Sequence, residues 1–505
     1  MAIRCGTEVE ARSFLFNAAF ACVLTLTSTS SFAAANPERP DFQLGLAAFI
    51  EQLRTARQVP PGFVVVAVHG GDTVFEQAYG TRNLATGATL TLDTPIYNAS
   101  TTKAYTGLLA AILDKQGLLS LDATLREVWP DIPPSSTFDP GAIRASALLA
   151  HIPGINEGGI NFRSNVTGEI SAAEIPGRLA AYAVKRESGF RYSNFGPYVW
   201  STMMEAKLGV PWRDMIAREL FEPLELRRTT ARLEDFPAGE LARCHAWMGG
   251  RWHTVPLKPT PILNAAGGIY TSGRDTGRFL KAFLTDGQSA QNRITAAALR
   301  RTWERVSVQD LDFFGLNRDG YGLGWDLGTY DGHRFVARSG GANGCRSIIL
   351  FLPAADFGMA VLSLGDDGAN SLNVSIVKQA IDLWNPSAQA DERGRQRVAA
   401  FAALVVADTA DPKHRRRPLD ARVSEAAAGV YENERLGRFT LSAAGGELTI
   451  SGGVFTAELV PVAEDEFLVA QRANAETETL RLIRGADGRV TGFMWDDDQY
   501  DRRAN

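Results

Sequence analysis

The chain of 505 residues has only four cysteines, no long block of charge of one sign and no mature segment apolar enough to span a bilayer. Its 52 basic and 57 acidic residues leave a net charge of −5, so no basic face points to a nucleic acid partner. We also expect no stable insertion into a membrane. With 45% hydrophobic residues, the composition is typical of a folded protein of two or three domains, and a small molecule or peptide is the expected substrate.

The N-terminus has the pattern of an export signal. Arg4 and Arg12 precede an apolar stretch over 14–26, and a run of small residues ends at Ala35. We expect residues 1–35 to be a bacterial-type signal peptide and the mature protein to be periplasmic or secreted. A buried N-terminal helix is the alternative interpretation.

Two of the four cysteines, Cys5 and Cys22, fall within the expected signal peptide, which leaves Cys244 and Cys345 in the mature chain. In an oxidising compartment these two either form a disulfide or stay free. Their spacing is not that of a metal-binding motif. We therefore expect neither a metal nor a cofactor.

The order of structural signals along the chain favours an α+β domain. A β-hairpin is predicted over 63–79, helical periodicity dominates 101–233, and short β-type runs return between 321 and 363. This order predicts an antiparallel sheet flanked by helices, completed by both ends of a domain over 40–385, with a mostly helical subdomain.

A change of pattern marks a second domain. Residues 386–418 contain a helical pattern and a basic run, which indicates a linker with a helix. Over 419–505, short alternating runs are separated by glycine-rich turns. These runs predict a small antiparallel β-barrel or sandwich.

No serine of the chain lies in a Gly-x-Ser-x-Gly elbow, so a nucleophilic serine would need another means of activation. Ser100-Thr101-Thr102-Lys103 offers a different device, since a serine in the first turn of a helix has Lys103 on the same face one turn later. A lysine amine can then take the serine proton, and the helix N-terminus can stabilise an oxyanion. A second match, Ser375 to Lys378, lies inside a predicted amphipathic helix, where we expect surface structure.

Several further segments follow one another in the order of a known family. They are Ile96 to Lys103, Leu148 to Ile155, Phe190 to Asn194, Phe221 to Leu224, Ala266 to Ser272, Tyr321 to Trp325 and Arg338 to Gly341. The chain resembles the penicillin-binding serine hydrolases, in the class C β-lactamase-like branch with D-alanyl-D-alanine carboxypeptidases, D-aminopeptidases and related esterases. The resemblance implies the serine β-lactamase fold and an acyl-enzyme on peptide, amide or ester substrates.

The resemblance also implies a role for each matching residue. Ser100 would be the nucleophile, Lys103 its proton-accepting neighbour and Tyr192 the general base and acid. The backbone N–H groups of Ser100 and Gly341 would form the oxyanion hole. The residues implied in substrate binding are Asn194, Arg338, Ser339, Gly340 and Gly341.

Alternatives exist for the Tyr-x-Asn motif and for the second domain. Tyr192 and Asn194 would otherwise be a packed aromatic and a helix N-cap, and Tyr431 to Asn433 repeats the same spacing near the start of the barrel. The terminal domain resembles the lipocalin-like barrel that some peptidases of this branch carry. The loops of this barrel would restrict entry to the active site. Alternatively, the barrel would only be an added module that stabilises the enzyme or serves for docking.

Arg338 departs from the family pattern, which usually has Lys or His at this position. An arginine cannot act as a base, but its planar fork suits a substrate carboxylate and its charge supports the site. The alternative is that Arg338 pairs with a local acid.

His151 matches a structural position of the family. A rival function is that of a catalytically silent sensor that binds peptidoglycan or β-lactams.

Overall fold

The computed structural model describes residues 40–135, 137–290, 293–386, 389–404, 417–470 and 478–503. The expected signal peptide, 1–35, and most of the basic run in the linker lie outside these residues. Within the described part of the chain, no helix is long and apolar enough to cross a membrane.

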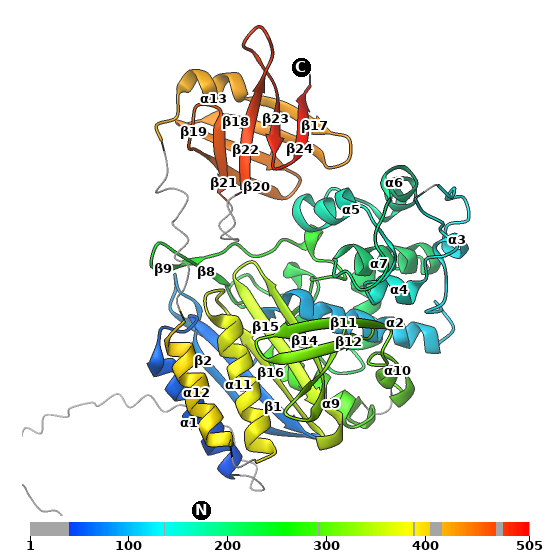
Figure 1. The fold of residues 1–505 in the computed structure, drawn as a ribbon, viewed down its shortest axis with the longest axis vertical. Helices are drawn as coiled ribbons and strands as arrows, with labels where there is room; N and C mark the ends of the chain where they lie inside the picture. Colours follow the sequence, from blue (N-terminus) through cyan, green and yellow to red (C-terminus); the bar gives the residue numbers. More distant parts are fainter. Residues whose placement is uncertain are drawn as a thin grey trace, which may run out of the picture. The chain divides into compact units, whose positions relative to one another are not determined.

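The larger domain is built on a nine-stranded antiparallel sheet with the order β11-β12-β13-β14-β15-β16-β1-β2-β3 (Figure 1). The N-terminal hairpin β1–β2 joins the late strands because β1 pairs with β16 along its whole length. Both ends of the domain therefore complete one sheet, and the predicted α+β fold is confirmed. The strands are β1 (Gly62–His69), β2 (Asp72–Asn83), β3 (Ala88–Thr89), β11 (Ser307–Phe313), β12 (Leu316–Tyr321), β13 (Asp326–Tyr330), β14 (His333–Ala342), β15 (Cys345–Leu352) and β16 (Phe357–Ser363).

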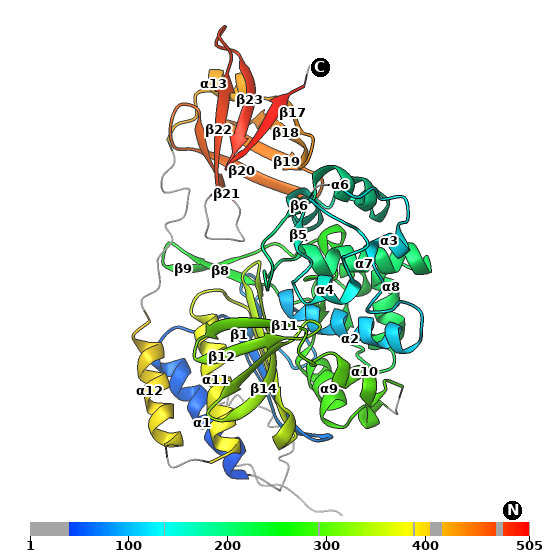
Figure 2. The ribbon, with the colours of Figure 1, turned by 45° about the vertical axis from the view of Figure 1, so that its right-hand side comes forward.

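Helices cover both faces of the sheet, which explains why β1 is a continuous apolar run rather than an alternating one. Val64, Val66 and Val68 face the core that contains α2 and α9. Their neighbours Phe63 and Val65 face the opposite core, below α1 and α11. Figure 2 shows the two helical layers on either side of the sheet. These helices are α1 (Pro40–Ala56), α2 (Thr102–Lys115), α9 (Gly273–Leu284), α11 (Ala369–Trp384) and α12 (Ala390–Ala402).

The middle of the chain adds the mostly helical subdomain and a short three-stranded sheet in the order β4-β10-β7. Strand β4 leads into the short 3-10 helix η1 (Ala99–Thr101) and directly on into α2. The remaining elements are β4 (Ile96–Tyr97), α3 (Leu125–Val128), α4 (Ala145–Leu149), β5 (Ile155–Asn156), α5 (Gly158–Phe162), α6 (Ile175–Tyr182), β6 (Val184–Lys185), α7 (Phe195–Leu208), α8 (Trp212–Ile216), β7 (Thr229–Thr230), β8 (His245–Met248), β9 (Arg251–Thr254), β10 (Tyr270–Thr271) and α10 (Ala296–Arg301).

A disulfide joins Cys244 and Cys345, 101 residues apart in the sequence, with their Cα atoms 5.1 Å apart. The bond connects the residue before β8 to the first residue of β15. It lies at the end of the β14–β15 hairpin that carries Gly341. Of the two states that the sequence allowed for these cysteines, the structure has the paired one.

The C-terminal domain is a closed barrel of eight antiparallel strands, as predicted. Its own core contains Phe439, Phe493, Trp495 and Tyr500. Tyr431, the repeat of the Tyr-x-Asn spacing, is buried there and its hydroxyl donates to the carbonyl of Ala427 at 2.6 Å. The elements are α13 (Ala421–Ala427), β17 (Gly429–Asn433), β18 (Gly437–Ala444), β19 (Glu447–Gly452), β20 (Phe455–Pro461), β21 (Glu466–Ala470), β22 (Glu478–Arg484), β23 (Val490–Trp495) and β24 (Asp498–Arg502).

Candidate active site

Ser100 lies on a sharp turn between a strand and a helix. The backbone N–H of Asn98 donates to the carbonyl of Ile269 at 2.9 Å, which fixes the end of β4. Ala99 then adopts φ = +47°, a left-handed conformation that is uncommon for a residue with a side chain. This strained turn leaves the side chain of Ser100 half-buried at the entry to α2, where it remains accessible.

Strand β14 lies against this turn, and Gly340 makes the approach possible. A Cβ atom at Gly340 would lie 2.5 Å from the carbonyl oxygen of Asn98 and 2.8 Å from the amide nitrogen of Thr101. Gly340 is buried in this contact, whereas its neighbour Gly341 is exposed. Of the two glycines predicted to bind substrate, Gly340 packs against the nucleophile turn and Gly341 faces solvent beside it.

Lys103 is buried, and its amine lies between three oxygen atoms. The Nζ atom lies 2.6 Å from the carbonyl of Ala266, 2.7 Å from Oδ1 of Asn194 and 3.1 Å from Oγ of Ser100. Burial lowers the pKa of Lys103 to about 8, with Tyr192 opposing the shift and Arg338 adding to it. A charged amine has three N–H donors, one for each of these oxygens, so it can donate to Ser100 while it stays bound to Ala266 and Asn194.

Tyr192 approaches Ser100 from the other side. Its hydroxyl lies 2.9 Å from Oγ of Ser100 and accepts a hydrogen bond of 2.6 Å from Nη2 of Arg338. Burial of the hydroxyl raises the pKa of Tyr192, but Arg338 and Lys103 together outweigh burial and lower it below that of a free tyrosine. The side chain is 45% exposed, which weakens the effect of burial and favours the same direction.

Asn194 occupies the N-cap position of α7, yet its side chain makes no capping hydrogen bond. The side-chain oxygen instead accepts the hydrogen bond from Lys103. This arrangement contradicts the interpretation of Asn194 as a helix cap.

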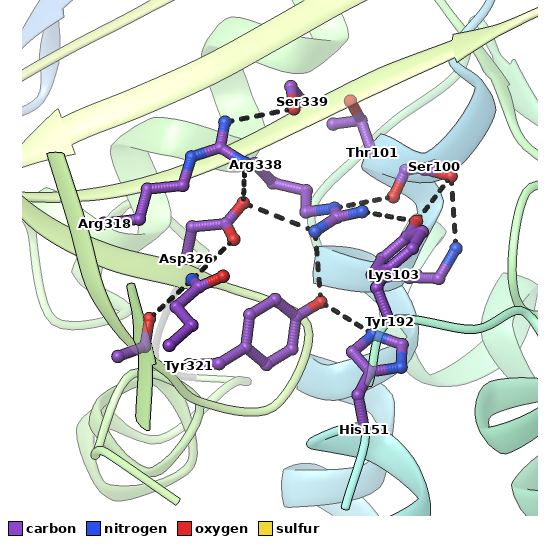
Figure 3. A network of polar contacts seen from close by, with 12 residues as sticks. Ser100, Thr101, Lys103, His151, Tyr192, Arg318, Tyr321, Asp326, Arg338 and Ser339 are labelled. Atoms are coloured by element: carbon purple, nitrogen blue, oxygen red, sulfur yellow. Dashed lines mark hydrogen bonds and ion pairs between the residues drawn. The ribbon is translucent and has the colours of Figure 1, made fainter. Parts of the chain in front are cut away.

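Arg338 lies beneath the site, with only 4% of its surface exposed (Figure 3). Nε donates to the carbonyl of Ser100 at 3.1 Å, Nη2 to Tyr192, and Nη1 to the hydroxyl of Tyr321 at 3.2 Å and the carboxylate of Asp326 at 3.3 Å. Burial opposes the charged form of Arg338, but Tyr192, Tyr321 and Asp326 together raise its pKa. Every guanidinium nitrogen already has a partner, which favours support of the site and pairing with a local acid over recognition of a substrate carboxylate.

Sequence reasoning missed the residues behind Arg338. Asp326 directly follows the Tyr321 to Trp325 motif, but nothing in its local sequence indicates a pairing with Arg338. Arg318 also pairs with Asp326, and its Nη2 donates to Oγ of Ser339 at 3.2 Å. The polar network around Tyr192 therefore continues into the sheet beyond the residues of the motifs.

His151 is buried beneath Tyr192, with the two ring centres 4.6 Å apart. Its Nε2 lies 3.2 Å from the hydroxyl of Tyr321, and its Nδ1 accepts a hydrogen bond from the backbone N–H of Ser193 at 3.3 Å. Burial, then Lys103 and Arg338, lowers the pKa of His151 well below its ordinary value. A neutral His151 thus holds the segment that carries Tyr192, in agreement with the structural position that its motif predicts.

The family model described as "Beta-lactamase" matches residues 46–382, about two thirds of the chain. The chain belongs to the β-lactamase family of serine hydrolases. It is 24% identical to penicillin-binding protein 4 of Amycolatopsis lactamdurans over 394 residues, which cover 76% of this chain and 96% of that protein. It is 25% identical to the unguisins hydrolase ungD′ of Aspergillus campestris over 337 residues, 64% of this chain and only 62% of that protein.

Solved structures share the fold of this family member. The octameric penicillin-binding protein homologue from Pyrococcus abyssi has a TM-score of 0.57 and 20% identity, and the match covers 90% of this chain and 98% of that one. The D-amino acid amidase from Ochrobactrum anthropi SV3 also has a TM-score of 0.57 and 20% identity, over 70% of this chain and all of that one. At these identities the likeness shows the fold alone.

The second Ser-x-x-Lys segment of this β-lactamase family member lies far from the site, in α11. Ser375 is buried there, so the expectation of surface structure was wrong, because α12 covers this face of α11: Gln379 and Asp382, one and two turns further on, both pair with Arg397. Lys378 donates instead to the carbonyl of Phe314 at 3.2 Å. Among the residues that the structure describes, no three His, Cys, Asp or Glu side chains are placed to hold a metal ion.

Proposed function

We propose that this chain is an exported serine hydrolase that forms an acyl-enzyme on Ser100 with peptide, amide or ester substrates. One observation carries the proposal: Oγ of Ser100 lies within hydrogen-bond distance of both Nζ of Lys103 and Oη of Tyr192. Both groups have a lowered pKa, as general bases that work near neutral pH require. Ser100 is therefore the activated nucleophile.

In the acylation step, Oγ of Ser100 attacks the carbonyl carbon of the substrate, and its proton passes to the ionised hydroxyl of Tyr192. Lys103 and Arg338 stabilise that phenolate, since their cationic groups lie 4.9 Å from the centre of its ring. The oxyanion accepts hydrogen bonds from the backbone N–H groups of Ser100 and Gly341. When the bond to the leaving group breaks, Tyr192 returns the proton to the departing nitrogen or oxygen.

Deacylation uses the same groups with water as the nucleophile. Tyr192 takes a proton from the water as it attacks the ester carbonyl, and Oγ of Ser100 receives that proton when it departs. Asn194 holds Lys103 in place and is positioned to contact the substrate amide. Ser339 and Gly341, at the accessible end of β14, line the substrate side of the nucleophile.

Two kinds of observation support the substrate class and the location. Among the similar proteins are a D-amino acid amidase, an unguisins hydrolase and a penicillin-binding protein, names that favour amide or peptide bonds over other substrates. The export pattern of the N-terminus and the Cys244–Cys345 disulfide favour a periplasmic or secreted protein.

Intact-mass analysis after exposure to a fluorophosphonate or a penicillin tests the proposal. We expect one adduct, mapped to the Ser100 peptide, and turnover of a chromogenic ester or amide that is lost in Ser100→Ala. An adduct on another residue would overturn the assignment. A permanent adduct on Ser100 with no turnover of ester, amide or cephalosporin would identify the sensor instead.

A further inference from the structure

A single buried carboxylate connects two arginines that both reach the site. Asp326, at the start of β13, is only 2% exposed. One of its oxygens, Oδ2, lies 3.2 Å from Nη1 of Arg318 and 3.3 Å from Nη1 of Arg338. The other, Oδ1, accepts a hydrogen bond of 2.9 Å from Nε2 of Gln309. Both carboxylate oxygens are thus fully engaged.

The far ends of the two guanidinium groups contact the residues around the nucleophile (Figure 3). Arg338 reaches the hydroxyl of Tyr192 and the carbonyl of Ser100, and Arg318 reaches the hydroxyl of Ser339. Within the described residues, Asp326 is the only carboxylate that pairs with either arginine. Its removal would leave two buried positive charges close together without a counter-charge.

We propose that Asp326 is a positioning residue, which holds the guanidinium group of Arg338 against Tyr192 and Ser100. The proposal rests on the proposed function, because it concerns the base of that reaction. Arg338 has a long side chain with many rotamers. Without the shared carboxylate, its repulsion from Arg318 would move the guanidinium group away from the Tyr192 hydroxyl.

Positioning and simple electrostatics predict opposite effects on Tyr192. As a nearby negative charge, Asp326 disfavours the phenolate, so its neutralisation alone would lower the pKa of Tyr192. If Asp326 holds Arg338 in place, its neutralisation releases the strongest cationic partner of Tyr192, and the pKa rises. The other charged or titratable groups that face Tyr192 stay in place in both cases. They are Lys103, His151, Tyr321, Arg318 and Tyr97.

The test compares Asp326→Asn with a matched control, Asp382→Asn. Asp382 is equally buried, and it also lies between two arginines, Arg393 and Arg397, and beside a tyrosine, Tyr330. Its cluster joins α11 and α12 on the opposite side of the sheet from the nucleophile. Both substitutions remove a buried charge from an arginine pair, so both should lower the thermal unfolding temperature.

Only Asp326→Asn should change the chemistry. We expect phosphonylation of its Ser100 by a fluorophosphonate, with loss of fluoride, to be about 10- to 100-fold slower than that of the wild type. We also expect the acid limb of the pH profile to move to higher pH by about one pH unit. Asp382→Asn should keep the acid limb of the wild type. If the acid limb of Asp326→Asn lies at the same pH as that of the wild type, or at a lower pH, the proposal is overturned.

A second readout separates this proposal from the proposed function. Tyrosinate absorbance in the near ultraviolet, taken as the difference between each protein and its Tyr192→Phe variant, reports the titration of Tyr192 without any turnover. A wild type that forms no adduct refutes the proposed function, while this titration still tests Asp326. If Asp326→Asn does not fold, Asp326→Glu displaces the carboxylate by one methylene and should also raise the pH at which Tyr192 titrates. An unchanged titration would overturn the proposal.

Discussion

Two segments of this chain have the same Ser-x-x-Lys spacing on a helix and entirely different surroundings. Ser100 lies where β4 turns sharply into α2, and Lys103 below it contacts Asn194 and Ala266. Ser375 lies in the middle of α11, buried on the face that α12 covers, and Lys378 reaches the carbonyl of Phe314 and the ring of Tyr330. The helix brings serine and lysine together in both places, but only the first has a strained turn that exposes the hydroxyl.

Sequence spacing therefore brings a serine and a lysine together on one helix face, but the surrounding fold determines whether they can react. At Ser100, Tyr192 comes from one distant part of the chain, and Arg338 and Gly340 come together from another, strand β14. Beside Lys378 lie a tyrosine and an arginine as well, but Tyr330 and Arg397 both contact the buried carboxylate of Asp382. The following predictions test how much of the difference lies in these partners.

The largest expected effect is that of Ser100→Ala, which should abolish adduct formation and lower turnover by at least about 10³-fold. The loss follows from removal of the oxygen that lies within hydrogen-bond distance of both Lys103 and Tyr192. Ser375→Ala should react at nearly the wild-type rate. Intact-mass kinetics with one fluorophosphonate measures both variants, and equal rates would abolish the distinction between the two segments.

A smaller loss is expected from Tyr192→Phe, because Lys103 remains beside the nucleophile. Acylation should fall by roughly 10² to 10⁴, the usual contribution of a positioned proton-transfer group. Tyr431→Phe, in the repeated Tyr-x-Asn spacing of the barrel, is the control. It removes the hydrogen bond to Ala427 and should cost about 1 kcal/mol of stability with no change in acylation.

Arg338→Lys keeps a positive charge but loses the fork that binds Tyr192, Ser100 and Asp326 together. We expect kcat/KM to fall by about 10- to 100-fold. Because Arg338 is buried and already paired, neutral and carboxylate-bearing esters should be affected alike. A selective loss for the acidic ester would restore the interpretation of Arg338 as a carboxylate-binding residue.

The smallest expected effects concern the pH profile of acylation. Tyr192 must be ionised to take the proton of Ser100, and although burial raises its pKa, Arg338 and Lys103 lower it to about 8. Acylation should therefore rise with pH up to about 8 and fall about tenfold for each pH unit below it. Lys378→Met should leave this limb unchanged, whereas Lys103→Met removes a cation beside Tyr192, so it should move the limb to higher pH and lower the activity.

Much of the site was predictable because its residues lie in short motifs that follow one another in the order of the family. Ser100, Lys103, Tyr192, Asn194 and Arg338 converge as the resemblance implies. The sheet was predictable for a physical reason, since an apolar run such as β1 must be buried on both faces.

The rest depended on contacts between residues that are distant in sequence or lack a local signature. Asp326 and Arg318 are separated from the nucleophile by more than two hundred residues, and acidic and basic residues are common on any surface. Likewise, the burial of Ser375 depends on which face of α11 is covered by α12. Periodicity places a residue on a helix, but the packing of the domain decides whether the polar group is exposed.

The contact at Gly340 has a consequence for protein engineering. A saturation library across β14 should be sharply uneven, because even alanine at position 340 would collide with the backbone of Asn98 and Thr101. Position 341 is different: a Cβ there would approach the far end of the flexible Arg346 side chain rather than backbone atoms. Attempts to redirect the substrate preference of this enzyme should therefore keep residue 340 constant and draw diversity from its neighbours.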